Sequence, residues 1–206
     1  MRRVAFLKAA LAALLCAAAL AARAEEIEVR NAQLLATEEG VALNADFVFD
    51  FAPRLAEMVA NGVPLYFVGE FELTRPRWWW FDEKAVAKRI QQRLSYHAVS
   101  RHYRLSTGLL QQQFATLEEA LQVLRSVRNW VVIDRSASLA DANYEAALRM
   151  RLDTTLLPKP FQLSALTSRE MNLESSWRRF AIRPPPAAAP ASAPAETRDP
   201  KEADTK

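Results

Sequence analysis

Long runs in which apolar and polar residues alternate one by one restrict this chain to a β-rich fold. Between positions 41 and 51 every odd residue is apolar, and residues 64–74 and 86–103 continue the period of two. Because successive side chains of a strand point to opposite faces, the pattern is typical of strands with one face against a core. Further strands are predicted at 27–36, 101–107 (a continuation past a bend or a separate strand), 130–134, 144–153 and 173–182.

Two short helices are predicted among these strands. Pro53 begins the first, and Asn61 and Gly62 provide its left-handed stop. The second follows a capping box formed by Thr116 and Glu119, and its apolar spacing extends to about residue 128. Seven or eight strands without regular βαβ alternation favour an antiparallel immunoglobulin-like β-sandwich. Residues 157–160, with two prolines, are interpreted as a linker.

The two ends of the chain differ from the predicted sandwich. Residues 1–24 have a basic start, a small apolar stretch and a small-x-small pattern before Glu25, as a cleaved secretory signal peptide has. The apolar stretch is shorter than the roughly 20 residues that span a bilayer, so a retained inner-membrane anchor is the alternative. Residues 184–206 are rich in Pro and Ala, then charged, and predict a disordered tail. One sandwich domain over residues 25–183 is left.

Removal of the signal changes the charge and the thiol content. It takes four of the 27 basic residues and none of the 24 acidic ones, so the mature chain carries a net charge of −1. Cys16, the single cysteine, leaves with it. The mature chain therefore lacks the basic field that nucleic-acid binding needs, and it has no thiol for a disulfide, a nucleophile or a metal. We expect a periplasmic or secreted protein.

The most unusual stretch is RPRWWWFDEK at positions 75–84. It lies between two long predicted strands, which predicts a hairpin. Consecutive residues of an extended chain face opposite sides, so one or two of its rings would face solvent and bind a partner. In the alternative interpretation the rings close the end of the sandwich, lean on the helices and are covered by arginines. The candidate partner-binding residues are Arg75, Arg77, Trp78, Trp79, Trp80, Phe81 and Lys84.

Basic residues of the middle of the chain give a second, weaker indication of a binding surface. If they gather on one sheet face they form a patch for an anionic polymer or an acidic partner, and otherwise they are the solvated outer face of core strands. These residues are Arg75, Arg77, Lys88, Arg93, Arg101 and Arg104.

Indications of catalysis are weaker still. Glu70 and Glu72 share the outward face of a predicted strand and, with Asp82, suggest a glycosidase pair. His97 and His102 would lie on opposite faces of one extended strand, so a shared metal needs a bend between them. The sequence has no P-loop, Rossmann glycine set, G-x-S-x-G or HExxH motif. We therefore assign no catalytic residue, metal or cofactor.

Several features together resemble an uncharacterised family of exported proteobacterial proteins. They are the signal peptide, the first strand pair, RPRWWWFDEK, SYHAVSRHYRLS at 95–106, and a capped helix leading to RNWVVID at 128–134. The resemblance covers roughly residues 25–183 and implies an exported bacterial protein of a domain-of-unknown-function family, with no assigned activity or ligand.

The expected function is therefore non-enzymatic. The sandwich would bind another cell-envelope macromolecule, an envelope protein or a polysaccharide, through its aromatic-basic hairpin. The alternative is a hydrolase of envelope carbohydrate that uses the outward carboxylates Glu70, Glu72 and Asp82. After signal cleavage no spanning segment is expected.

Overall fold

The computed structural model describes residues 27–77, 83–137, 139–140 and 142–182. These residues form nine strands, all paired antiparallel, and three α-helices. The strands are β1 (Glu28–Thr37), β2 (Gly40–Val48), β3 (Leu65–Arg75), β4 (Glu83–His97), β5 (His102–Thr107), β6 (Leu110–Phe114), β7 (Ser126–Asp134), β8 (Tyr144–Leu152) and β9 (Arg178–Ile182). The helices are α2 (Pro53–Ala60), α3 (Leu117–Leu124) and α4 (Lys159–Thr167), with 3-10 turns η1 (Thr154–Leu156) and η2 (Arg169–Met171).

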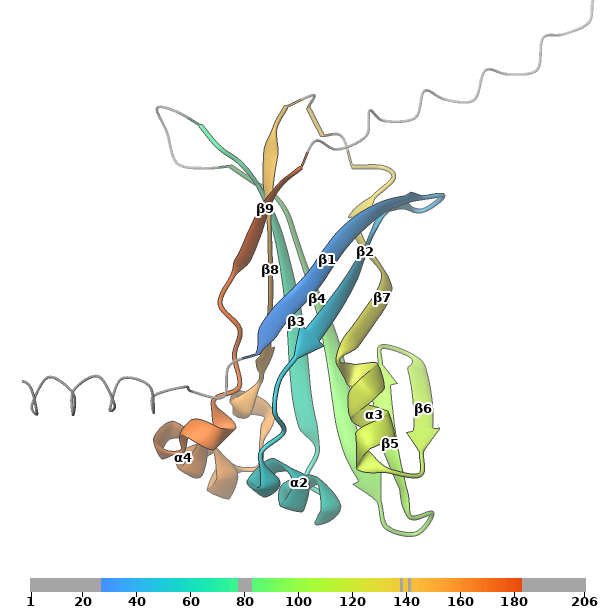
Figure 1. Ribbon diagram of the computed structural model, residues 1–206, viewed down its shortest axis with the longest axis vertical. Coiled ribbons are helices and arrows are strands. Elements are labelled where there is room, and N and C mark those ends of the chain that lie inside the picture. Colours follow the sequence, from blue (N-terminus) through green and yellow to red (C-terminus); the bar gives the residue numbers. More distant parts are fainter. Residues whose placement is uncertain (1–26, 78–82, 138, 141, 183–206) are drawn as a thin grey trace, which may run out of the picture.

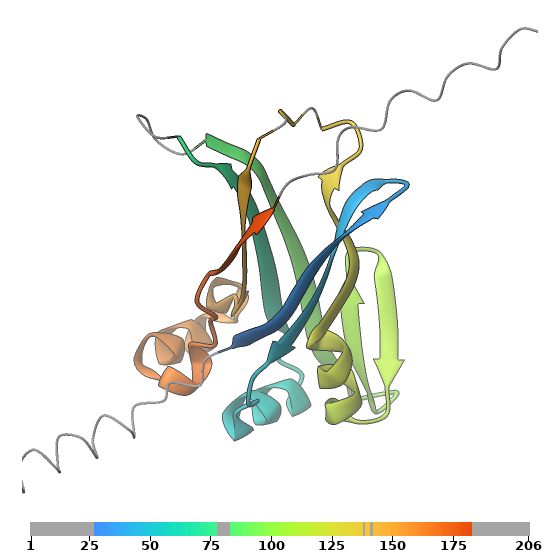
Figure 2. The ribbon, with the colours of Figure 1, turned by 45° about the horizontal axis from the view of Figure 1, so that its top comes forward.

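Two sheets lie face to face and enclose the core. One has three strands in the order β1-β2-β7, and the other has six in the order β6-β5-β4-β3-β8-β9. Figure 1 shows the smaller sheet crossing in front of the larger one, with α2, α3 and α4 gathered at one end. The view in Figure 2, turned by 45°, shows the same arrangement. The mainly β, antiparallel architecture predicted from the alternation is confirmed.

The finer predictions of the fold need correction. Nine strands are described rather than seven or eight, because β6 is not among the predicted strands. Residues 102–107 form the separate strand β5, which is one of the two alternatives that the sequence leaves open. Three α-helices are described rather than two. An immunoglobulin constant domain pairs its first two strands with the fourth and fifth, whereas here β1 and β2 are joined by β7. The strand order therefore does not confirm an immunoglobulin-like arrangement.

The alternating side chains of β3 form the centre of the core. Leu65, Phe67, Phe71 and Leu73 are completely buried. Phe71 makes an edge contact with Trp130 of β7, with ring centroids 6.5 Å apart, and so joins the two sheets. Each such ring contributes roughly 2 to 3 kcal/mol through burial alone. The predicted inward face of this strand is thus confirmed.

The helices illustrate what local signals predict. In α2, Pro53 stands in the first turn and Gly62 follows the helix with φ +84°, as expected. The capping box of α3 is present, since Glu119 N donates to Thr116 Oγ1 at 3.2 Å and Glu119 Oε2 accepts from Thr116 N. However, α3 ends at Leu124, earlier than predicted, because β7 begins at Ser126.

The predicted linker at 157–160 is wrong, because α4 begins there. Its prolines are the reason for the error. Pro158 is the N-cap and Pro160 lies in the first turn, where a missing N–H costs no hydrogen bond and the fixed φ suits a helix. The last predicted strand is also shorter than expected. Only Arg178–Ile182 is a strand, preceded by an isolated bridge between Glu174 and Arg151.

An ion pair fastens β7 to β2 at the edge of the smaller sheet. Asp46 accepts hydrogen bonds from the guanidinium of Arg128 and, at 3.3 Å each, from Asn31 and Ser126. The hydrogen bond from Arg128 is the largest influence on the Asp46 carboxyl, partial burial opposes it, and the net effect is a lowered pKa. The charged form is therefore favoured in the folded protein.

Asp46→Asn is expected to destabilise the protein mainly where this carboxylate is ionised. A pKa that is lower in the folded state gives stability that is complete above the unfolded value of about 3.9 and is lost as pH falls through the folded value. We expect a loss below about 1 kcal/mol at pH 7, because the pair is exposed, and a smaller loss at pH 2. Urea unfolding at both pH values measures it, and an equal loss at both would contradict the assignment.

Candidate functional site

β3 and β4 form the antiparallel strand pair that the sequence predicts on either side of the aromatic stretch. The two strands pair antiparallel along their length, from Leu65 with Leu94 to Arg75 with Glu83. They are the longest strands in the described part of the chain. The end of β3 and the start of β4 lie at the end of the larger sheet opposite to α2 and α4 (Figure 1). The alternative interpretation, in which the rings lean on the helices, concerns residues outside the described ranges and stays a prediction.

Charged side chains pair across the base of this hairpin. Arg77 forms an ion pair with Glu83, and Lys84 Nζ lies 2.6 Å from Glu72 Oε1. These side chains are 30 to 52% exposed, so the pairs are solvated and individually weak. Arg75 is half-buried at the end of β3. The other candidate residues, Trp78, Trp79, Trp80 and Phe81, lie outside the described residues.

The predicted basic patch is only partly assembled. Arg93 and Arg104 share the outer face of the larger sheet, where Arg93 lies 5.9 Å from the centre of the Tyr66 ring. Lys88 points to the opposite face and its Nζ pairs with Asp134 of β7 at 2.7 Å. Arg101 stands in the turn between β4 and β5 with φ +53°. Alternation along the strands, which separates even from odd positions, explains the split.

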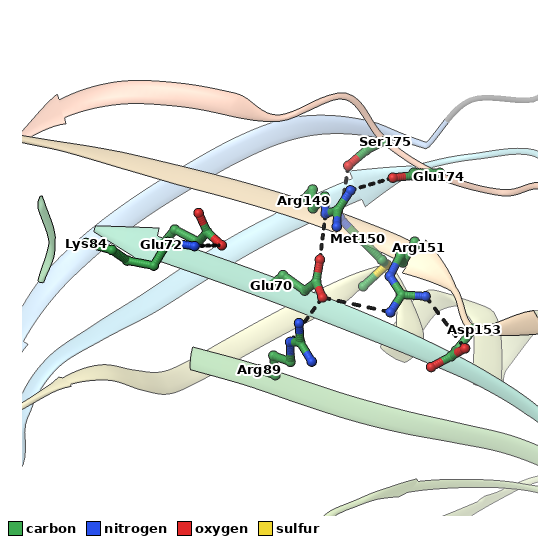
Figure 3. A network of polar contacts seen from close by, with 10 residues as sticks. All are labelled: Glu70, Glu72, Lys84, Arg89, Arg149, Met150, Arg151, Asp153, Glu174 and Ser175. Carbon is green, nitrogen blue, oxygen red and sulfur yellow. Dashed lines mark hydrogen bonds and ion pairs between the residues drawn. The ribbon is translucent and has the colours of Figure 1, made fainter. Parts of the chain in front are cut away.

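Glu70 is far more buried than its place on the outer face of a strand would suggest. Its side chain is on the outer face as expected, yet it is only 6% exposed. Arg89 of β4 and Arg149 of β8 stand directly opposite it in the two neighbouring strands. Arg149 Nε donates to Oε2 at 2.6 Å, while Arg89 Nε and Arg151 Nη2 lie 3.1 and 3.8 Å from Oε1 (Figure 3). Glu70 thus lies on the predicted outward face of β3, but arginines of the neighbouring strands bury it there.

A second set of contacts holds these arginines in place. Arg149 Nη1 donates to Glu174 at 2.6 Å, and its guanidinium lies 4.5 Å from the centre of the Trp177 ring. Arg151 Nη1 lies 3.6 Å from Asp153, whose pKa is lowered on balance: burial alone would raise it, and hydrogen bonds from Thr155 with the charge of Arg151 outweigh that effect. Three arginines and three carboxylates thus balance in charge. We call this set of Glu70, Arg89, Arg149, Arg151, Asp153 and Glu174 the Glu70 network.

The Glu70 network is suited to holding strands rather than to acid–base chemistry. A general acid must carry a proton, and a nucleophile needs an accessible lone pair. Both oxygens of Glu70 form ion pairs with guanidinium groups, and the side chain is buried. Glu72 pairs with Lys84, and Asp82 lies outside the described residues. The described geometry therefore gives the hydrolase alternative no support. The sequence offered no signal for this network, because its arginines come from other strands.

The two histidines meet at a hairpin. His97 ends β4 and His102 begins β5, directly opposite each other, so the bend that a shared site would require is present. Both rings are engaged through Nδ1, His97 with Ser100 Oγ at 3.0 Å and His102 with the Ser100 carbonyl. No group of three or more His, Cys, Asp or Glu suited to a metal occurs in the described ranges. These contacts explain the histidines as turn-stabilising residues.

A shallow cavity of about 540 Å³ lies between α2 and the α4–η2 segment. Met58, Val63 and Phe161 form its apolar part, and Arg54, Glu57 and Glu170 its charged part. It has no convergent set of buried polar groups of the kind that fixes a small ligand. It lies at the end of the sandwich that holds the helices, away from the β3–β4 hairpin (Figure 1).

Comparison with known proteins gives one match. A family described as "Domain of unknown function (DUF4390)" matches residues 24–181, which is most of the chain and nearly all of its described part. No curated protein and no solved structure matches. The predicted resemblance to a domain-of-unknown-function family is confirmed.

Proposed function

We propose that this protein is a non-enzymatic binding module of the cell envelope. The chain belongs to the DUF4390 family, for which no activity is assigned. In this proposal the β3–β4 hairpin, residues 75–84, contacts another envelope macromolecule, a protein or a polysaccharide. Export by a cleaved signal peptide places the protein in the periplasm or outside the cell. The family match begins at residue 24, next to the expected mature terminus at Glu25, which supports this part of the proposal.

The position of the hairpin is the observation that carries the proposal. The two longest described strands lead to it, and β3 is paired on both sides, with β4 and with β8. A segment supported in this way is held by a rigid scaffold, as are binding loops at the ends of immunoglobulin-like sandwiches. Consecutive aromatic residues at such a position can insert their rings into a pocket of a partner protein or stack them on a sugar ring.

The chemistry of the described side chains favours binding over catalysis. The base of the hairpin combines Arg77, Lys84, Glu72 and Glu83 in exposed pairs that can exchange partners at low cost. The buried carboxylate nearby, Glu70, is saturated by arginines. No helix among the described residues is long and apolar enough to cross a membrane, and retention by an uncleaved signal stays the alternative for its location.

Loss of the three consecutive tryptophans is expected to abolish partner recovery without unfolding the protein. The variant is Trp78→Ala/Trp79→Ala/Trp80→Ala, compared with wild type in a crosslinking pull-down from periplasm. Alanine removes the ring surface that dominates such contacts, and at least tenfold less partner should be recovered. Far-UV circular dichroism and the unfolding midpoint establish that the variant is folded.

A matched control removes three large apolar side chains elsewhere. Val99, Leu156 and Leu163 are 91, 46 and 72% exposed, and their triple alanine variant should recover the same partners as wild type. Recovery of the same partners by a folded tryptophan variant would refute the hairpin as the binding site. Unfolding of the tryptophan variant would instead favour the interpretation in which the rings close the sandwich.

A further inference from the structure

β6 is an edge strand that lacks the charges, prolines and bulges that usually protect such strands against pairing. It bonds only to β5 in the larger sheet, and its sequence, LQQQF, has no charged residue and no proline. Natural edge strands are normally protected by charges, prolines, bulges or cover. Leu110 is 73% exposed and Leu109, in the preceding turn, is fully exposed. Figures 1 and 2 both show β6 at the margin of the molecule.

The other edge strands of the described sheets are protected. β9 begins with two arginines, and Arg178 Nη1 donates to the Val29 carbonyl of β1 at 3.1 Å. β1 itself carries Glu28 and Arg30. β7 carries Arg128 and Asp134 and is irregular, with two register shifts against β2. β6 therefore stands out among the four edges.

The backbone groups that β6 presents can be identified from its turn. Gly108, with φ +57°, and Leu109 form the two-residue turn of the β5–β6 hairpin, and Thr107 pairs with Leu110. In such hairpins the residues that flank the turn exchange both backbone hydrogen bonds, and bonded and non-bonded pairs then alternate. Leu110 and Gln112 therefore bond to β5, whereas the N–H and C=O groups of Gln111 and Gln113 point away from the sheet.

We infer that β6 is a self-association edge, at which a second copy of this chain adds its own β6 antiparallel about a two-fold axis at Gln112. With this axis, Gln111 stands opposite Gln113 of the second copy, and both have outward backbone groups, so four hydrogen bonds form. Leu110 stands opposite Phe114 of the second copy, which buries the exposed leucine. No charges oppose each other in this register.

The sequence of β6 favours β6 of a second copy of the chain as its pairing partner. The pattern apolar, three glutamines, apolar reads the same in both directions, so under a two-fold axis apolar residues meet apolar residues and glutamines meet glutamines. A single five-residue strand pair buries less than the roughly 1,200 Å² that stable complexes exceed. We therefore expect a weak dimer that depends on protein concentration. The inference is independent of the hairpin at residues 75–84 and of its partner.

The test compares two charge arrangements on the same edge by sedimentation velocity over a range of protein concentrations. Gln111→Lys/Gln113→Lys places like charges opposite each other twice and should raise the dimer Kd about tenfold. Gln111→Lys/Gln113→Glu places a lysine opposite a glutamate twice and should keep the wild-type Kd or lower it. The two variants share one substitution, so a folding defect caused by it affects both.

A control with the same charge change elsewhere is Gln33→Lys/Gln91→Lys, at two exposed positions outside β6, and it should dimerise as wild type does. Three results would overturn the inference. They are a wild-type protein that stays monomeric up to millimolar concentration, a double-lysine variant with the wild-type Kd, and a lysine–glutamate variant as weak as the double-lysine one. The third would show that the strands do not meet in this register.

Discussion

Glu70→Ala is expected to lower the free energy of unfolding by about 3 kcal/mol, although the residue is on the outer face of a sheet. Removing one partner from a buried ion pair costs about 3 to 5 kcal/mol, because the opposite charge is left buried without compensation. The lower end applies here, since Arg149 and Arg151 are about a quarter exposed and can reach water. Urea unfolding, followed by circular dichroism, measures the change.

Glu72→Ala is the matched control for this prediction. Glu72 is on the same strand and the same face, but its side chain is 30% exposed and pairs with the exposed Lys84. Its loss should cost less than about 1 kcal/mol. Both variants remove a glutamate carboxylate, and the two sites differ only in burial and in the number of arginines nearby. The difference between their losses of unfolding free energy therefore measures the contribution of the Glu70 network.

A double-mutant cycle distinguishes the network from a general effect of position 70. Glu70→Ala/Arg149→Ala should cost clearly less than the sum of its two single variants, because each single variant leaves a charge without its partner. Strict additivity would contradict the described contact between Arg149 and Glu70. A Glu70→Ala protein as stable as wild type would show that the carboxylate is not structural, and would reopen the hydrolase alternative.

Glu70 also shows how far alternation can predict a site. The period of two correctly gives the face on which each side chain of β3 lies. Burial on that face depends on the neighbours across the sheet, and Arg149 is 79 positions away in the sequence. Strand order is required to place them, and periodicity has no information about it. The pairing of β3 with β4, by contrast, joins strands that follow each other in the chain, so it could be predicted from the sequence.

The sequence predicts neither β6 nor α4, because in each segment its signals do not favour a single structure. β6 has no apolar alternation, and it is a strand because the turn at Gly108 folds it back onto β5. α4 has the signals of a helix start, but two closely spaced prolines are equally typical of an extended linker. In both segments the local sequence fits two structures, and the tertiary context decides between them.

Gly40→Ala is expected to be at least as damaging as Glu70→Ala, with a loss of about 3 kcal/mol or more. Gly40 begins β2 with φ +140°, a region that is unfavourable for any residue with a Cβ. An added Cβ would also lie 2.1 Å from the Ile133 carbonyl oxygen and 2.7 Å from Arg135 N. Both atoms belong to the backbone of the β7 segment, so a side-chain rotation cannot relieve the contact.

Gly62→Ala is the control that separates these two costs. Gly62 also has a positive φ, of +84°, but no atom lies within 4 Å of an added Cβ, so only the backbone strain of about 1 kcal/mol is expected. The excess loss in Gly40→Ala then measures how tightly the β1–β2 turn sits on β7, where Arg135 N donates to the Glu39 carbonyl at 2.8 Å. Equal urea midpoints for the two variants would contradict this expectation. They would mean that the β1–β2 turn can move away from β7 at little cost in free energy.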